Sequence, residues 1–255
     1  MDQEEENMSG KTERKRTGKK HLIFAAAVIL LLVPATLGVS RQFGNRRYYL
    51  CSVLLIFYSM LLFLSGFEKR KPQAREIVTL AVMCAVAVAS RAAFIMIPHF
   101  KPMTGIIMIT GIAFGPEAGF LTGAVSGFVS NFIFGQGPWT PWQMFAFGIA
   151  GFLAGVLGRA GVLGGHDRIR TSLFGGLTVL LLIGPILDTC SLFTMVTEIN
   201  RASAAAIYLS GLPVNVVHAL ATFLTLFFLC RPITEKLNRI KIKYGMMEED
   251  KGHEV

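Results

Sequence analysis

The chain has 255 residues, a formal net charge of +9, and a composition in which 53% of the residues are hydrophobic. Its charges gather at the two ends and between long apolar stretches, which suit the ~30 Å hydrocarbon core of a bilayer. This pattern excludes an ordinary soluble protein. It also argues against nucleic-acid binding, because basic residues that flank apolar spans are placed to contact anionic lipid headgroups.

Eight membrane spans are predicted, at about 21–39, 49–67, 75–97, 101–115, 117–135, 140–160, 171–197 and 205–233. The first is expected to be retained, since the polar start of the chain does not resemble a cleavable signal peptide. The expected fold class is an all-α integral membrane protein, a six-helix bundle preceded by a two-helix transmembrane hairpin.

A basic segment at 68–75 separates spans rich in Leu, Ile, Val and Phe from later spans rich in Gly and Ala. The predicted domains are a charged tail at 1–20, a transmembrane hairpin at 21–67, a membrane domain at 75–234 and a second tail at 235–255. Nineteen Lys and Arg residues fall on one side of the predicted topology and five on the other, with Arg91 inside a span. The positive-inside rule then places both termini in the cytoplasm and the chain in the cell membrane.

Two rows of small residues, each spaced by four, lie on two predicted helices: Ala81, Ala85 and Ala89, and then Gly115, Gly119, Gly123 and Gly127. Such rows allow another backbone to approach closely. The alanine row serves either internal packing or docking of a second membrane protein. Arg91 lies roughly 120° round the helix from the row, so a buried Arg91 would turn the row away from the bundle interior.

Proline and glycine mark several helix ends. The order Gly115-Pro116-Glu117 is expected to end one helix and begin the next, because Gly terminates helices, Pro fits the first turn and Glu favours the positive end of the helix dipole. Pro185 and Pro213 lie inside apolar spans, and each is expected to kink its helix.

Several polar residues lie at depth in the predicted spans. Arg91 and Asp188 are at a similar depth, so we expect them to form a pair or to share a polar cavity; the alternative is that Arg91 extends to the headgroups. Asn131, Asn215 and His218 form either hydrogen bonds between helices or contacts to a ligand. His218 is not expected to bind a metal, because no second ligand stands at a suitable spacing.

The segment 135–143, Gly-Gln-Gly-Pro-Trp-Thr-Pro-Trp-Gln, carries two tryptophans between two spans. Trp139 and Trp142 are either residues of the membrane-interface belt or, together with Gln136 and Gln143, a rigid mouth for a large planar polar ligand. The turn at 98–101 is predicted to lie on the same face and to form the opposite wall.

No nucleotide-binding loop and no metalloprotease motif is present, so the chain is not expected to hydrolyse ATP itself. One enzyme hypothesis stays open. Ser126 and His218 loosely resemble the serine–histidine pair of rhomboid proteases, although Ala124 replaces the glycine of that family.

Residues 75–234 resemble the substrate-binding S component of an energy-coupling factor (ECF) transporter. The resemblance depends on the alanine row and on the stretches 114–128 and 131–145, and among S components it is greatest to the cobalamin-type group. It implies a vitamin bound at the outer face, loops that close over it, and toppling of the S component against a transmembrane coupling subunit driven by two cytoplasmic ATPases. It also implies that Ala81, Ala85 and Ala89 contact the coupling subunit.

The predicted function is therefore the vitamin-binding subunit of an ECF importer, with no enzyme activity, no covalent cofactor and no metal. Cobalamin or a related corrinoid is the expected ligand. The predicted ligand-side residues are Arg91, Asn131, Gln136, Trp139, Trp142, Gln143, Asn215 and His218. The alternatives are an S component for a queuosine precursor, a flavin or a small heterocycle, a rhomboid-like protease, and a structural membrane scaffold.

Overall fold

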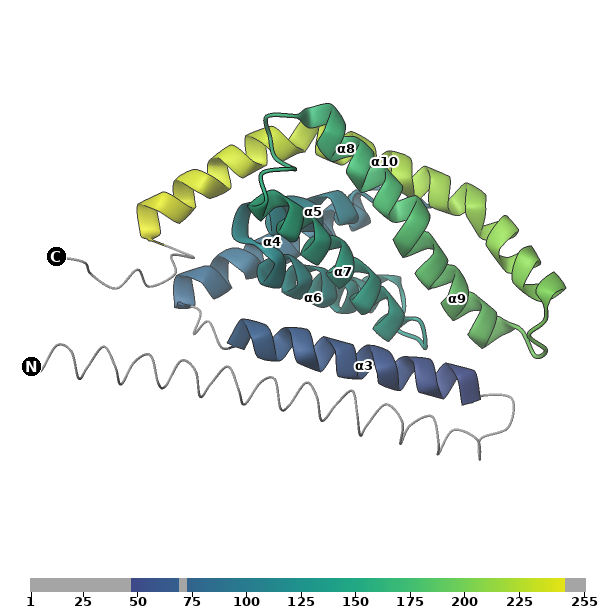
Figure 1. Cartoon of the computed structure of the whole chain (residues 1–255). Coiled ribbons are helices and arrows are strands. Elements are labelled where there is room, and N and C mark those ends of the chain that lie inside the picture. The colour runs from purple at the N-terminus through teal and green to yellow at the C-terminus, as the bar shows by residue number, and fades with distance from the viewer. Residues whose placement is uncertain (1–46, 69–72, 246–255) are drawn as a thin grey trace, which may run out of the picture. The chain divides into compact units, whose positions relative to one another are not determined.

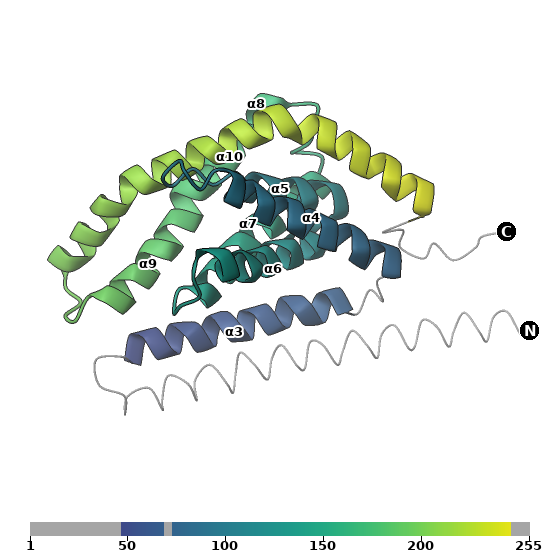
Figure 2. The ribbon, with the colours of Figure 1, turned by 180° about the vertical axis from the view of Figure 1, so that it is seen from behind.

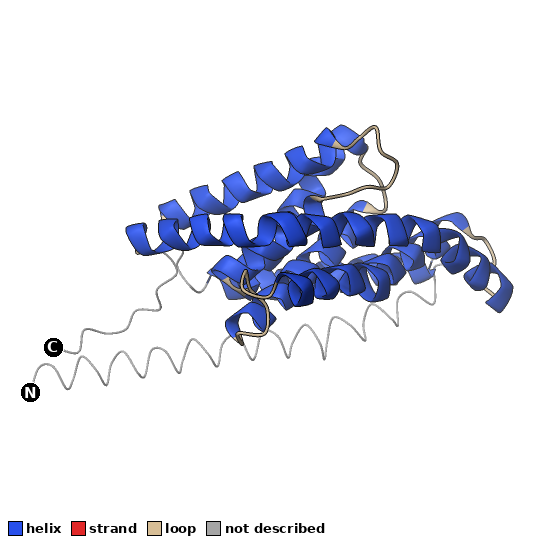
Figure 3. Cartoon of the chain, turned by 90° about the horizontal axis from the view of Figure 1, so that it is seen from above, coloured by secondary structure: helices blue, strands red, loops and turns tan. Residues whose placement is uncertain are grey.

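The computed structural model describes residues 47–68 and 73–245, and the described residues form helices without any strand (Figure 3). The predicted span at 21–39 and the tail at 1–20 lie outside the described residues. The helices are α3 (Arg47–Glu68), α4 (Ala74–Ala93), α5 (Met103–Phe114), α6 (Pro116–Phe134), α7 (Thr140–Arg159), α8 (Arg168–Thr178), α9 (Gly184–Met195) and α10 (Arg201–Tyr244). A π-helical segment, Val179–Ile183, joins α8 to α9.

The chain forms two compact units, Met1–Leu62 and Phe63–Val255. The second contains α4 to α10, and among its described residues four helical segments are long and apolar enough to cross a membrane: Ala74–Ala93, Thr140–Arg159, Arg168–Met195 and Arg201–Tyr244. This supports the expected all-α membrane fold, while the number of spans stays a prediction.

α5 lies at the centre of the second unit and packs against α4, α6, α7 and α10 (Figures 1 and 2). Apart from Thr104 and Thr110 its residues are apolar, they carry no charge, and all but one of the residues of the helix are buried. A helix without a polar face gains most by complete burial, which explains its central position. Ile106, Ile107 and Ile109 of α5 form the middle of the hydrophobic core.

The predicted glycine row brings α6 and α7 into backbone contact. A Cβ on Gly119 would overlap the carbonyl group of Gly151, and one on Gly123 would overlap the backbone of Phe147. A Cβ on Gly155 would lie 2.5 Å from the Cα of Pro116. The prediction that these small residues permit close helix approach is confirmed.

The predicted break at residues 115–117 is also confirmed. Gly115 ends α5 with a φ of 95°, and Pro116 begins α6. Glu117 in the first turn of α6 accepts a 2.9 Å hydrogen bond from Arg159 at the end of α7. This ion pair joins the two helices at the end of the bundle that also carries the α7–α8 loop.

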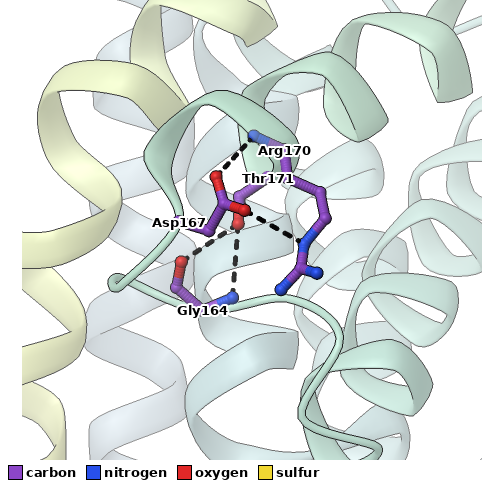
Figure 4. Close-up of polar contacts among 4 residues, drawn as sticks. All are labelled: Gly164, Asp167, Arg170 and Thr171. Atoms are coloured by element: carbon purple, nitrogen blue, oxygen red, sulfur yellow. Dashed lines mark hydrogen bonds and ion pairs between the residues drawn. The ribbon is translucent and has the colours of Figure 1, made fainter.

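The α7–α8 loop is held by its own polar contacts (Figure 4). Asp167 caps α8, because its Oδ1 accepts a 3.0 Å hydrogen bond from the backbone N–H of Arg170. Thr171 Oγ1 donates to the carbonyl of Gly164 at 3.0 Å and accepts from its N–H at 3.2 Å. These contacts connect the start of α8 to the preceding loop.

The prolines within apolar spans interrupt helices in two ways. Pro185 lies in the first turn of α9, directly after the π-helical segment Val179–Ile183. Pro213 and Pro232 both lie inside α10 and cannot donate a backbone hydrogen bond. Figure 1 shows α10 bent, with its yellow C-terminal limb running in a different direction from its green N-terminal part.

Candidate functional site

The loops 94–102, 135–139 and 196–200 lie at one end of the bundle (Figure 2), and most of the predicted ligand-side residues belong to these loops or to the helix ends beside them. We call this the tryptophan end. The ends of α4, α6 and α9 and the starts of α5, α7 and α10 meet there. Among the described residues, no group of three His, Cys, Asp or Glu side chains is placed to hold a metal ion.

Arg91 is a buried clamp between α4 and α6. Its side chain is only 8% exposed, and Nη1 donates to Ser130 Oγ at 2.5 Å and to Asn131 Oδ1 at 3.2 Å. The guanidinium also lies over the ring of Phe134, with Cζ 4.1 Å from the centroid. The Arg91 guanidinium therefore binds the last turns of α6 and does not extend to the headgroups.

The predicted pairing of Arg91 with Asp188 is wrong. Asp188 Oδ2 instead accepts a 2.8 Å hydrogen bond from Asn215 Nδ2. The reason is the arrangement of the helices, since α4 packs against α5 and α6 whereas α9 packs against α7 and α10. A similar depth in the membrane did not make the two charges neighbours.

The α6–α7 turn is held by a chain of side-chain hydrogen bonds that begins at Arg91. Asn131 Nδ2 donates to Thr140 Oγ1 at 3.1 Å, and Thr140 Oγ1 donates to Gln136 Oε1 at 2.9 Å. Gln136 Nε2 donates in turn to the carbonyl of Phe128 at 3.1 Å. The structure thus uses Asn131 and Gln136 to shape the turn, and a ligand role for them stays a prediction.

The two tryptophans have different environments. Trp139 is 40% exposed, and its indole N–H points to the carbonyl of Gly135 at 3.4 Å. Trp142 is only 6% exposed and meets Phe193 of α9 edge to face, with centroids 5.9 Å apart. Exposure of this kind fits a belt residue for Trp139, whereas Trp142 belongs to the interior.

Two buried polar atoms at the start of α7 have no hydrogen-bond partner among the described residues: Trp142 Nε1 and Gln143 Oε1. Leaving a buried donor or acceptor without a partner costs about 1–3 kcal/mol. One is a donor and the other an acceptor, and they belong to adjacent residues. A ligand with both kinds of group would satisfy them.

Asp188 and Asn215 form a second polar site between α9 and α10, and glycines make room for it. A Cβ on Gly184 would lie 2.6 Å from Asn215 Cγ, and one on Gly211 would lie 2.7 Å from Asp188 Cγ. On each helix the glycine stands four residues before the polar residue. Gly184 of α9 packs against Asn215 of α10, and Gly211 of α10 packs against Asp188 of α9. The same spacing of four, from Gly184 to Asp188 and from Gly211 to Asn215, is visible in the sequence. It is a signal for the Asp188–Asn215 contact that the prediction of the site residues did not include.

His218 lies in the core rather than at a mouth. Its side chain is 2% exposed, Nε2 lies 2.8 Å from Thr104 Oγ1, and its ring meets Phe147 edge to face at 6.3 Å. Ser126 lies on α6 beside Cys84 of α4. Ser126 Oγ has no hydrogen-bond partner among the described residues, and His218 contacts Thr104 instead, so the geometry of a rhomboid-like catalytic pair is not formed.

Lys101, named from the sequence only as part of the opposite wall, is a half-buried cation in the 94–102 loop. Burial, and next the positive charge of Arg91, lower the pKa of the Lys101 ammonium to about 8. None of the ion pairs among the described residues includes it.

The alanine row lies on the opposite side of α4 from Arg91. Ala81, Ala85 and Ala89 are exposed, whereas Met83, Ala87 and Arg91 are buried. Val78, Val82 and Val86 are exposed beside the row. The predicted geometry, with Arg91 inside and the row turned away from the interior, is confirmed.

Comparison with known proteins identifies a protein family. The family model for the ECF-type riboflavin transporter, S component, matches residues 71–234. No curated protein and no solved structure matches the chain. The match confirms the predicted S-component family and leaves the cobalamin-type subgroup unconfirmed, since the model names riboflavin.

The matched residues include the whole predicted substrate-binding domain at 75–234 and most of the chain. S components are transporter subunits, so the prediction that the chain is not an enzyme is confirmed, and the rhomboid hypothesis is wrong. The chain belongs to the family of ECF-type riboflavin transporter S components and is a substrate-binding membrane subunit of an ECF transporter.

Proposed function

We propose that the chain binds riboflavin, or a flavin of closely similar structure, at the tryptophan end and delivers it into the cell through an ECF module. The observation that carries the proposal is the family match over residues 71–234, which names riboflavin. A flavin was among the alternatives left open by the sequence.

The chemistry of the tryptophan end supports a flavin. The isoalloxazine ring is planar and apolar on its faces, with hydrogen-bond donors and acceptors along one edge. Trp142 and Phe193 supply aromatic surface, while Trp142 Nε1 and Gln143 Oε1 are a buried donor and acceptor without protein partners. The Asp188–Asn215 pair adds a carboxylate and an amide suited to the polar chain of the ligand.

Delivery requires a partner, because the sequence contains no nucleotide-binding motif. We propose that the exposed row of Ala81, Ala85 and Ala89 docks on the transmembrane coupling subunit of the module, which two cytoplasmic ATPases drive. Without large side chains the row permits close helix contact, and the absence of charge on it allows sliding within the bilayer.

Binding is tested by titrating the purified chain, in detergent or nanodiscs, with riboflavin and following the quenching of flavin fluorescence. Cobalamin is titrated in parallel and followed by its absorbance. We expect saturable binding of riboflavin with one site per chain, and no binding of cobalamin. Saturable binding of cobalamin without riboflavin binding would overturn the proposal in favour of the corrinoid hypothesis.

A matched pair of variants locates the site. Trp142→Ala is expected to weaken riboflavin binding by about 1–3 kcal/mol, since it removes a buried aromatic surface and an unsatisfied donor. Ser126→Ala, which changes a buried residue on α6 beside Cys84, is expected to leave binding unchanged. Equal affinities for the two variants would place the ligand elsewhere.

A further inference from the structure

The 94–102 loop carries a half-buried cation, Lys101, at the tryptophan end. Successive turns hold the loop, with the N–H of Ile97 donating to the carbonyl of Phe94 at 3.0 Å and that of Phe100 donating to Ile97 at 3.3 Å. His99 has a left-handed backbone, with a φ of 62°. This conformation is unfavourable for a residue with a side chain. It reverses the chain just before Lys101, and the Phe100 ring packs on Phe94 with centroids 5.0 Å apart.

The charges around Lys101 are positive. Arg91 approaches from α4, and both Arg91 and Lys101 act electrostatically on His218 of α10. The carboxylate of Asp188 is engaged by Asn215 instead. Arg91 has hydrogen-bond acceptors in Ser130 and Asn131, whereas no hydrogen bond or ion pair among the described residues involves the Lys101 ammonium.

Burying a charge is costly unless an acceptor compensates for the lost water. Lys101 has a flexible stem and could place its ammonium in the headgroup region, which is the ordinary solution for an isolated lysine at a membrane boundary. A half-buried ammonium without an acceptor among the described residues is unfavourable in the free protein. An acceptor-rich ligand would make the same position favourable, because a hydrogen bond from a charged donor is stronger than one between neutral groups.

We propose that Lys101 is a ligand-recognition residue, whose ammonium donates to an acceptor-rich group of the bound flavin. The proposal rests on the proposed function. Two parts of riboflavin have this chemistry, the carbonyl groups of the pyrimidine edge and the hydroxyl groups of the ribityl chain.

The test compares Lys101→Met with wild type in the riboflavin titration. The loss of one charged hydrogen bond is expected to weaken binding about 10- to 100-fold. Lys236→Met, which removes an exposed lysine on the C-terminal limb of α10, is the matched control and is expected to bind as wild type. Lumichrome, the flavin ring without a ribityl chain, distinguishes the two acceptors. An equal loss for lumichrome assigns the contact to the ring, and an unchanged lumichrome affinity assigns it to the ribityl hydroxyls.

A pH titration of the wild-type chain provides a second readout that does not depend on a variant folding. If the charged ammonium binds the ligand, affinity is constant below the Lys101 pKa of about 8 and falls as the pH rises through it. The measurement covers a window of about pH 7.5 to 9.5, which lies above the ordinary titration range of an imidazole. Lys101→Met is expected to abolish this dependence.

The outcomes separate the inference from the function on which it rests. Failure of the wild type to bind riboflavin at any pH overturns both. Tight riboflavin binding that is independent of pH and unchanged in Lys101→Met retains the flavin function and overturns the role of Lys101. That second result would indicate that the lysine reaches the headgroups.

Discussion

At the scale of single residues, the Arg91 guanidinium joins α4, α6 and the turn that leads into α7. Replacing it by Met removes the hydrogen bonds to Ser130 and Asn131 and the contact with the Phe134 ring. It also leaves polar atoms of α6 buried without a charged partner. We expect Arg91→Met to lower the free energy of unfolding by about 2–4 kcal/mol. A thermal-unfolding measurement in detergent checks this, and the exposed Arg168→Met on α8 is the control, expected to unfold as wild type. A destabilised Arg168→Met, or a stable Arg91→Met, would contradict the clamp.

Predictions about single residues from the sequence were correct where they depend on the geometry of one helix alone. The side of α4 that carries Arg91 follows from the helical repeat, so the opposite orientation of Ala81, Ala85 and Ala89 could be predicted. The partner of Arg91 could not, because it depends on which helices are neighbours. Depth along a span says how far a side chain lies from the membrane surface, whereas the choice between Asp188 and Asn131 is made by packing.

At the scale of elements, the apolar pattern locates helices better than it locates their ends. The predicted spans at 75–97, 117–135 and 140–160 correspond to α4, α6 and α7 within a few residues. The last helix was predicted to end near 233, yet α10 continues to Tyr244. Hydropathy marks only the part of a helix that suits lipid, and the polar residues after Pro232 include good helix formers that extend it beyond that part. The π-helical segment gives no comparable signal in the pattern of apolar residues.

The exposed row on α4 can be tested by a substitution that disturbs docking without disturbing ligand binding. Ala85→Leu places a large side chain in the middle of the row, where close contact with the coupling subunit is proposed. We expect riboflavin uptake by cells to fall at least about tenfold, which corresponds to roughly 1.4 kcal/mol of lost docking, while binding by the purified chain stays unchanged. Ala206→Leu, the same substitution at an exposed position of α10, is the control and is expected to keep normal uptake. Full uptake by Ala85→Leu would remove the row from the docking surface.

At the scale of the whole molecule, import requires the tryptophan end to face outward. The positive-inside rule favours this orientation, because Arg159, Arg168 and Arg170 lie at the opposite end of the bundle. The C-terminal limb of α10 points to the same end as these arginines and adds Lys236, Arg239 and Lys243 on exposed positions.

Cysteine labelling in intact cells tests this orientation directly. The native cysteines Cys51, Cys84, Cys190 and Cys230 are buried, so a membrane-impermeant maleimide is expected to report only cysteines introduced at the surface. Glu198→Cys in the 196–200 loop is expected to react from outside, whereas Lys243→Cys is expected to react only after the cells are permeabilised. The wild-type chain is the control for background labelling. The reverse pattern would place the ligand end in the cytoplasm, where capture of an external vitamin is impossible, and the import function would then have to be abandoned even if riboflavin binds.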